Sequence, residues 1–215
     1  YDHPVGQPGY VPNASFYKLW YPNQRWRGST IVSHAIGQGE ILMTPIQLAN
    51  VAATIANRGF FYTPHFVKGV QGDFIDPKYK TKRETSISKK HFTNVIEGMA
   101  DVVSKGTARV AAIREVEVCG KTGTIENFTK IDGVRTQLTD HSVFIAFAPK
   151  DDPKIALAVI IENGYWGARW AAPIASLVIE NYLSGEVKRT WLENRMVKGS
   201  LEEEYNKITS NKPFT

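Results

Sequence analysis

The residues best suited to chemistry lie in one short run, Gly120-Lys121-Thr122-Gly123-Thr124. The run combines a fixed positive charge and two hydroxyl groups with a glycine that leaves the backbone open to a second extended chain. Alternating apolar and polar residues at 116–118 predict a β-strand over 116–124, with Thr122 and Thr124 on one face and Lys121 on the other. Such a strand at a sheet edge offers hydrogen-bond donors and a cation to a peptide-like ligand that ends in a carboxylate.

The sequence Gly-Lys-Thr also ends the phosphate-binding P-loop, but two observations exclude that alternative. The P-loop requires another glycine five positions before Gly120, where this sequence has Glu115, whose charge would repel phosphate. A helix should also open after Lys121, and residues 125–128 show no helical pattern of apolar residues. We therefore exclude a nucleotide site here.

Composition indicates a globular chain. Its 215 residues, 42% of them hydrophobic, are enough to bury one core. The net charge is +5, but the basic residues are scattered, so we expect no nucleic-acid partner. Cys119 is the single cysteine, which excludes an internal disulfide, and the five histidines show no metal-ligand spacing. We expect neither a metal nor another cofactor.

The beginning of the sequence suggests a piece of a longer protein. The chain opens at Tyr1 without a methionine or a secretion signal. No run of the sequence reaches the roughly 18 apolar residues of a membrane span. We therefore expect a fragment or a processed product.

Three helices are predicted from the spacing of apolar residues. Thr44 and Gln47 form a capping box before a helix over 45–57, which is apolar nearly all round and is therefore expected to be buried. A second helix follows Ser88 as its cap and carries one apolar face as far as Val103. The third covers 172–183, and its larger apolar residues are expected to face a sheet: Ile174, Leu177, Val178 and Tyr182.

Two apolar strands, 141–148 and 155–161, complete the expected sheet. The turn between them is short enough to force an antiparallel hairpin. Because both strands are apolar on both faces, helices must cover both sides of the sheet. We expect irregular chain over 1–30, extended chain over 60–70, and polar loops over 71–86 and 125–140.

Seven separated motifs follow one another along the chain: Ile36-Gly37-Gln38-Gly39, Thr44-Pro45-Ile46-Gln47, Gly98-Met99, Gly106-Thr107-Ala108, Gly120-Lys121-Thr122-Gly123-Thr124, Phe147-Ala148-Pro149 and Glu162-Asn163-Gly164. In this order they resemble the C-terminal half of the transpeptidase domain of class B penicillin-binding proteins, and within them the elongation-type penicillin-binding protein 2. The resemblance implies an α/β fragment of the serine β-lactamase-like fold, with three antiparallel strands and helices on both faces. Residues 1–184 would form this half-domain, and 185–215 a charged, partly helical tail.

The resemblance also implies roles for the central run. Lys121 would line the active site and support proton movement. The hydroxyls of Thr122 and Thr124 would hold the terminal carboxylate of a D-Ala-D-Ala stem peptide or of a β-lactam. The backbone N–H of Thr124 would form half of an oxyanion hole, and Gly123 would keep the strand open to the ligand.

The nucleophile of this family is expected outside the chain. The family places it in Ser-x-x-Lys, followed by Ser-x-Asn, and the sequence contains no Ser-x-Asn. Ser-x-x-Lys occurs at Ser15-Lys18 and at Ser86-Lys89, but neither pair opens a buried helix, so we reject both. The chain alone is therefore expected to be inactive, and the rest of the transpeptidase domain is its first expected partner.

The family further implies a periplasmic enzyme at the inner membrane, held by an N-terminal anchor, that cross-links peptidoglycan beside a membrane glycosyltransferase of the elongation complex. Two alternatives stay open. One is a D,D-carboxypeptidase or β-lactamase-like hydrolase, because water exclusion cannot be inferred from the sequence. The other is a non-catalytic scaffold that retains the penicillin-recognising strand over 116–124.

Other chemically capable residues have simpler interpretations. Cys119 is expected to be a small packed residue of the strand, because Lys121 alone gives little support for a reactive thiolate. His141 opens an apolar strand, which favours a structural role, and Glu126 is expected to face solvent. The aromatic residues Tyr165, Trp166 and Trp170 suit either a groove or the core.

Overall fold

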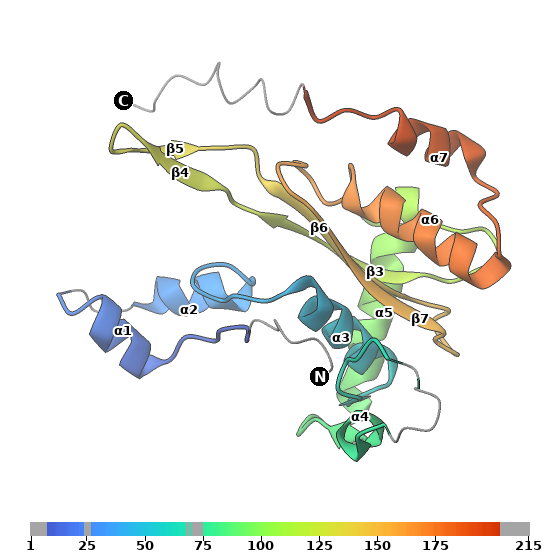
Figure 1. Cartoon of the computed structure of the whole chain (residues 1–215), viewed down its shortest axis with the longest axis horizontal. Helices are drawn as coiled ribbons and strands as arrows, with labels where there is room; N and C mark the ends of the chain where they lie inside the picture. Colours follow the sequence, from blue (N-terminus) through green and yellow to red (C-terminus); the bar gives the residue numbers. More distant parts are fainter. Residues whose placement is uncertain (1–7, 24–26, 68, 70–74, 203–215) are drawn as a thin grey trace.

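A three-stranded antiparallel sheet forms the centre of the fold (Figure 1). The computed structural model describes residues 8–23, 27–67, 69 and 75–202. The strand order is β3 (Cys119–Ile125), β6 (His141–Ala148) and β7 (Ile155–Ile161), so β3 and β7 are the edges among the described strands. The strands β6 and β7 have the predicted bounds. The strand β3 begins later than predicted, because Val116 pairs in an isolated bridge with Ile113.

Helices cover both faces of the sheet, as predicted (Figure 1). Alternation along β6 sends Phe147 to one face and Phe144 to the other. On the first face, Phe147 packs with buried residues of α3 (Pro45–Ala56) and α5 (Lys90–Ser104). On the second face, Phe144 packs with α6 (Ala171–Ser184) and the 3₁₀ turn η1 (Arg109–Ala111). The sheet is therefore packed against apolar side chains on both faces. Its edge strand β3, which we call the site strand, carries the run Gly120 to Thr124.

The predicted capping box of α3 is present: Gln47 N donates to Thr44 Oγ1 at 3.4 Å, and Thr44 N donates to Gln47 Oε1 at 2.8 Å. The prediction that α3 is buried nearly all round is wrong, because only its residues Ala52 and Ala56 are buried. The reason is that α3 also borders an open apolar groove of about 730 Å³, shared with α5.

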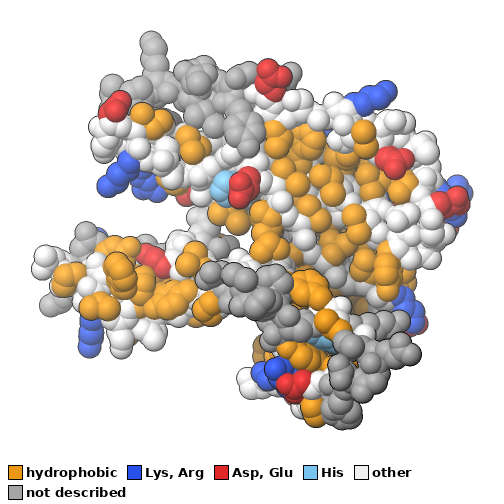
Figure 2. Space-filling model, in the orientation of Figure 1, with side chains coloured by type: hydrophobic (Ala, Val, Ile, Leu, Met, Phe, Trp, Pro, Cys, Tyr) orange, Lys and Arg blue, Asp and Glu red, His pale blue; other side chains and the backbone are white. Residues whose placement is uncertain are grey.

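On α6, two of the four residues expected to face the sheet, Val178 and Tyr182, lie on the outer face, and the other two, Ile174 and Leu177, are half-buried. The side chains of Val178 and Tyr182 are 48% and 62% exposed, and hydrophobic side chains gather on the visible surface over the sheet and α6 (Figure 2). Small residues face the sheet instead, and Ala172, Ala175 and Ile179 are fully buried. Small side chains let the helix axis approach the sheet closely, whereas the prediction selected the larger residues.

The N-terminal region is helical rather than irregular as predicted. It contains α1 (Ala14–Trp20) and α2 (Gly28–Ala35), and Figures 1 and 2 show both helices projecting from the body that holds the sheet. Asn13 Oδ1 caps α1 by accepting from Phe16 N at 2.9 Å. Tyr17 O–H donates to Glu40 Oε2 at 2.7 Å and ties α1 to the turn after α2. The described prolines of this region, Pro8, Pro12 and Pro22, lie before and after α1 and do not interrupt it.

Other segments between the main elements are also more regular than predicted. The expected loop over 125–140 contains a hairpin, β4 (Phe128–Ile131) and β5 (Val134–Gln137), whose turn residues Asp132 and Gly133 both have positive φ. The short strand β1 (Phe60–Phe61) pairs with β2 (Arg83–Glu84), and α4 (Pro77–Lys80) precedes β2. The cap of α5 is Lys89 rather than Ser88. Residues 71–74 of the expected loop over 71–86, 68 and 70 of the expected extended chain, and 1–7 and 24–26 of the expected irregular start lie outside the described residues.

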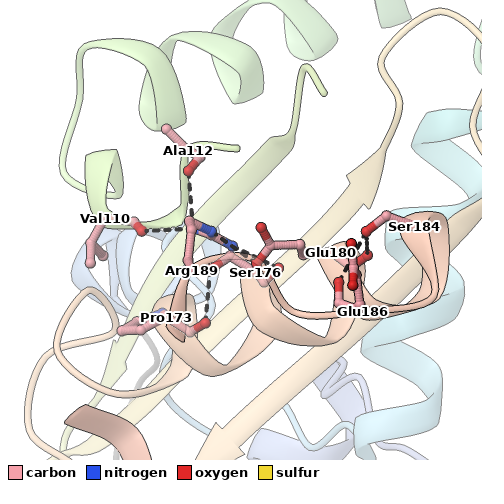
Figure 3. Close-up of polar contacts among 8 residues, drawn as sticks. All are labelled: Val110, Ala112, Pro173, Ser176, Glu180, Ser184, Glu186 and Arg189. Carbon is pink, nitrogen blue, oxygen red and sulfur yellow. Dashed lines mark hydrogen bonds and ion pairs between the residues drawn. The ribbon is translucent and has the colours of Figure 1, made fainter. Parts of the chain in front are cut away.

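An arginine after α6 joins three segments of the fold (Figure 3). Arg189 Nε lies 3.1 Å from Glu180 Oε2, and its two terminal nitrogens donate to the carbonyls of Ser176 and Ala112, each at 3.0 Å. The helix α7 (Thr190–Val197) follows, and its Leu192 is fully buried. The predicted boundary at residue 184 stays a prediction, and residues 203–215 lie outside the described part.

Candidate functional site

The run from Gly120 to Thr124 forms most of the edge strand β3. Its register pairs Thr122 with Phe144 and Thr124 with Ser142 of β6. Cross-strand partners share a face, so both threonines lie on the α6 side and Lys121 lies on the other, as the alternation predicted. Gly120 is buried, and a Cβ there would lie 2.2 Å from the Phe144 ring. Glycine at this position is therefore required by packing.

The hydroxyl of Thr122 meets a second hydroxyl from a distant segment. Thr107 Oγ1 lies 3.2 Å from Thr122 Oγ1, and Thr107 belongs to the turn that follows α5. Gly106 makes this turn tight, because a Cβ there would lie 2.7 Å from Val102 Cα. Two hydroxyls at this spacing can donate to one carboxylate. Sequence reasoning quoted Thr107 within a motif but gave it no role at the site.

Lys121 and Thr124 are exposed, whereas Thr122 and Gly123 are half-buried. Lys121 Nζ donates to the Thr122 carbonyl at 2.7 Å. Within the part of the chain that the structure describes, Lys121 forms no ion pair with a carboxylate. No described carboxylate therefore pairs with its positive charge, and its side chain leaves β3 from the face opposite the threonine side chains. The structure therefore brings Lys121, Thr122, Gly123 and Thr124 together with Thr107 at one edge of the sheet.

Aromatic residues come shortly before and after Gly167, which lies against Thr122 and Gly123. Tyr165 and Trp166 stack with ring centroids 4.8 Å apart, and Trp166 is 60% exposed. Trp170 is half-buried, and its indole nitrogen has no hydrogen-bond partner among the described residues. Of the two interpretations left open by the sequence, exposure at a surface therefore fits Trp166.

The remaining chemically capable residues have structural surroundings. Cys119 is fully buried, and burial raises the pKa of its thiol to about 12, which makes it the packed, unreactive residue that was predicted. His141 Nδ1 accepts from the backbone N–H of Asn163 at 3.0 Å. Glu126 is exposed, as predicted.

The two Ser-x-x-Lys pairs lie on the surface. Ser15 and Lys18 are one turn apart on α1, and both are exposed. Ser86 and Lys89 are also exposed and precede α5. None of these serines has the buried helical setting of an activated nucleophile.

The described residues show neither a metal centre nor a membrane helix. No group of three or more His, Cys, Asp and Glu residues within ranges 8–23, 27–67, 69 and 75–202 could hold a metal ion. None of the helices in these ranges has both the length and the hydrophobicity needed to cross a membrane.

Known proteins match this chain over most of its length. Peptidoglycan D,D-transpeptidase MrdA of Acinetobacter baumannii is 33% identical over 196 residues, which cover 85% of this chain and 28% of MrdA. The crystal structure of Pseudomonas aeruginosa PBP2 in complex with WCK 5153 superposes with a TM-score of 0.67 at 31% identity, covering 85% of this chain and 39% of that one. Helicobacter pylori PBP2, solved as a complex with MreC, superposes with a TM-score of 0.66 at 27% identity, covering 85% and 32%.

The chain thus spans less than a third of the MrdA sequence. The family described as "Penicillin binding protein transpeptidase domain" matches residues 11–180, which contain the edge strand, the Thr107 turn and the helices on both faces of the sheet. This chain therefore belongs to the family of penicillin-binding protein transpeptidase domains.

Proposed function

We propose that this chain is the substrate-binding half of a peptidoglycan D,D-transpeptidase domain. The observation that carries the proposal is the edge strand β3, which presents the Lys121 ammonium and, beside the Thr107 hydroxyl, the Thr122 hydroxyl from its two faces. An extended peptide can pair with such an edge through its backbone. The relatives' names, D,D-transpeptidase among them, favour transfer over hydrolysis and over a non-catalytic scaffold.

Each residue of the strand has a proposed role in holding the substrate. The hydroxyls of Thr122 and Thr124 donate to the terminal carboxylate of a D-Ala-D-Ala stem peptide, or to the carboxylate of a β-lactam that mimics it. Lys121 supplies positive charge and assists proton movement. Gly123 has no side chain, so the ligand backbone can lie against β3.

The backbone N–H of Thr124 is proposed as one donor of an oxyanion hole. A serine oxygen attacks the carbonyl carbon of the penultimate D-Ala, and the negative charge that develops on the carbonyl oxygen is stabilised by this donor. Loss of one such donor costs about 2.7–4 kcal/mol of transition-state stabilisation. Collapse of the intermediate expels the terminal D-Ala, and the amine of a second stem peptide then takes the acyl group from the serine.

We propose that the nucleophilic serine belongs to polypeptide outside this chain. Both Ser-x-x-Lys pairs in the chain are exposed, and no Ser-x-Asn is present. The chain alone should therefore not form an acyl-enzyme. Residues 1–184 are proposed as the half-domain and 185–215 as a partly helical tail; the family match, which ends at residue 180, supports this division.

The cellular setting is likewise proposed from the relatives. Helicobacter pylori PBP2 has been solved with MreC. By analogy, the full-length protein would act at the periplasmic face of the inner membrane, in an elongation complex that includes a membrane glycosyltransferase.

Labelling of the full-length protein with a fluorescent penicillin tests the proposal. We expect one covalent adduct, which mass spectrometry locates on a serine outside the chain described here. Pre-incubation with unlabelled penicillin should abolish it. Failure of the folded protein to form any adduct would favour the scaffold alternative, and an adduct on Ser15 or Ser86 would overturn the assignment of the nucleophile.

A further inference from the structure

A buried serine in β6 fastens a neighbouring loop beside the site strand. Ser142 is fully buried and lies directly opposite Thr124 in the strand register. Its hydroxyl donates to the Trp166 carbonyl at 2.9 Å and accepts from the Ala171 N–H at 3.1 Å. Trp166 belongs to the connection between β7 and α6, residues 162–170, which we call the β7–α6 loop, and Ala171 is the first residue of α6. One hydroxyl thus binds both the loop and the start of the helix that follows it.

Gly167 lies between these two partners of Ser142 in the chain and against the site strand. A Cβ at Gly167 would lie 2.5 Å from the Val143 carbonyl oxygen, 2.8 Å from the Gly123 carbonyl oxygen and 3.1 Å from Thr122 Cβ. Two of these three atoms are backbone atoms, which cannot rotate away as a flexible side chain would. Glycine alone therefore lets the loop pack this closely against residues 122 and 123.

The beginning of the loop is held by residues that flank the same strands. Asn163 N donates to His141 Nδ1 at 3.0 Å, and Tyr165 N donates to the Asp140 carbonyl at 2.8 Å. Asn127, which follows β3, donates from Nδ2 to Asn163 Oδ1 at 2.8 Å. The loop is thus fixed at its start, middle and end, and always to β6, to β3 or to residues next to them.

We propose that the β7–α6 loop supports the backbone of residues 122–124 in the geometry needed for acylation, which makes Ser142 and Gly167 positioning residues. This inference rests on the proposed function. Among the described strands, β3 pairs only with β6, and the loop adds a close backbone contact at residues 122 and 123. An oxyanion donor acts only when it lies within about 2.7–3.1 Å of the developing charge. A displacement of about 1 Å can reduce the rate about 100-fold.

The test compares two disturbing substitutions with two matched controls in the full-length protein. Gly167→Ala adds a methyl group against the site strand, and Gly98→Ala adds one on α5 where no atom lies within 4 Å. Ser142→Ala removes the double anchor, and Ser176→Ala removes an equally buried hydroxyl that donates within its own helix, to the Pro173 carbonyl. Rapid mixing with a penicillin gives the dissociation constant and the acylation rate constant separately, and thermal unfolding gives stability.

We expect Gly167→Ala and Ser142→Ala to lower the acylation rate constant, measured per folded molecule, about 10- to 100-fold. Gly98→Ala and Ser176→Ala should keep the parent rate constant, even if Ser176→Ala lowers the melting temperature. If Ser142→Ala fails to fold, Ser142→Cys is measured in its place. Cysteine has nearly the volume of serine, and its thiol is a weaker hydrogen-bond donor than the hydroxyl. Parent acylation rates in Gly167→Ala and in the folded Ser142 variant would overturn the inference. An unreactive parent protein would instead remove the proposed function, and this inference with it.

Discussion

The hydroxyl oxygens of Thr107 and Thr122 lie 3.2 Å apart, although the two residues come from the turn after α5 and from the edge strand β3. Their proximity depends on Gly106, which brings the turn against the end of α5. In the proposed site the pair offers two donors to one carboxylate, so Thr107 joins the residues that the sequence had singled out.

Removal of the Thr107 hydroxyl should weaken ligand binding. In the full-length protein, Thr107→Val keeps the shape but loses one hydrogen bond, worth about 1.5 kcal/mol, and should raise the dissociation constant for penicillin about tenfold. Thr107→Ser should retain parent affinity. The control Thr93→Val changes an exposed threonine of α5 and should have no effect. Unchanged affinity in Thr107→Val would exclude Thr107 from the carboxylate site.

Lys121→Ala should slow acylation strongly while the protein stays folded. The side chain is exposed, so its loss should hardly alter stability. A positioned proton-transfer group contributes about 10²–10⁴-fold to rate, and a loss in that range is expected. Lys105→Ala serves as control, because the Lys105 ammonium makes an exposed ion pair with Asp101 of α5. The acylation rate is measured with a fluorescent penicillin. An acylation rate of Lys121→Ala equal to that of the parent protein would exclude Lys121 from the mechanism.

Arg189→Met should destabilise the fold by about 3–5 kcal/mol, because Glu180 would be left as a buried charge without its partner. The double variant Arg189→Met, Glu180→Met should recover much of this loss, since neither charge is then buried. Arg114→Met, at an exposed position, is the control. Denaturant unfolding measures all three. Equal stability of the two Arg189 variants would show that the unpaired charge of Glu180 is not the cause of the loss.

Cys119 should resist alkylation until the protein unfolds. Burial raises the pKa of its thiol to about 12, so the reactive thiolate is absent from the folded state near neutral pH. The unfolded thiol loses its proton near pH 9, whereas the folded thiol keeps it, so stability should fall as the pH rises from 9 toward 12. Peptide mapping after iodoacetamide treatment, with and without denaturant, tests the first point. Replacement by Ala should make the alkaline loss of stability less steep.

The elements with local signals were predictable from the sequence. Thr44 and Gln47 mark the start of α3, because the side chain of each forms a hydrogen bond with the backbone of the other. The turn between β6 and β7 is so short that the two strands must form a hairpin. The hairpin β4–β5 also had such a signal, Asp132-Gly133, because both residues adopt the positive φ that a two-residue turn demands. The prediction of a loop there missed it.

Other features depend on contacts between distant residues and had no local signal. The inner face of α6 is chosen by how closely Ala172 and Ala175 allow the helix to approach the sheet, which size and hydrophobicity of the side chains do not reveal. The meeting of Thr107 with Thr122 and the bonds of Arg189 to Glu180 and Ala112 likewise arise only after the sheet has assembled.

The contact between Gly120 and the Phe144 ring limits which amino-acid substitutions β3 can accept during evolution. The aromatic ring occupies the space in which a side chain at position 120 would stand. A residue larger than glycine can occupy position 120 only in a protein in which Phe144 has already been substituted by a smaller residue. That substitution leaves a cavity in the core. The first glycine of the run is thus maintained by its neighbour on β6, independently of which antibiotic or peptide reaches the strand.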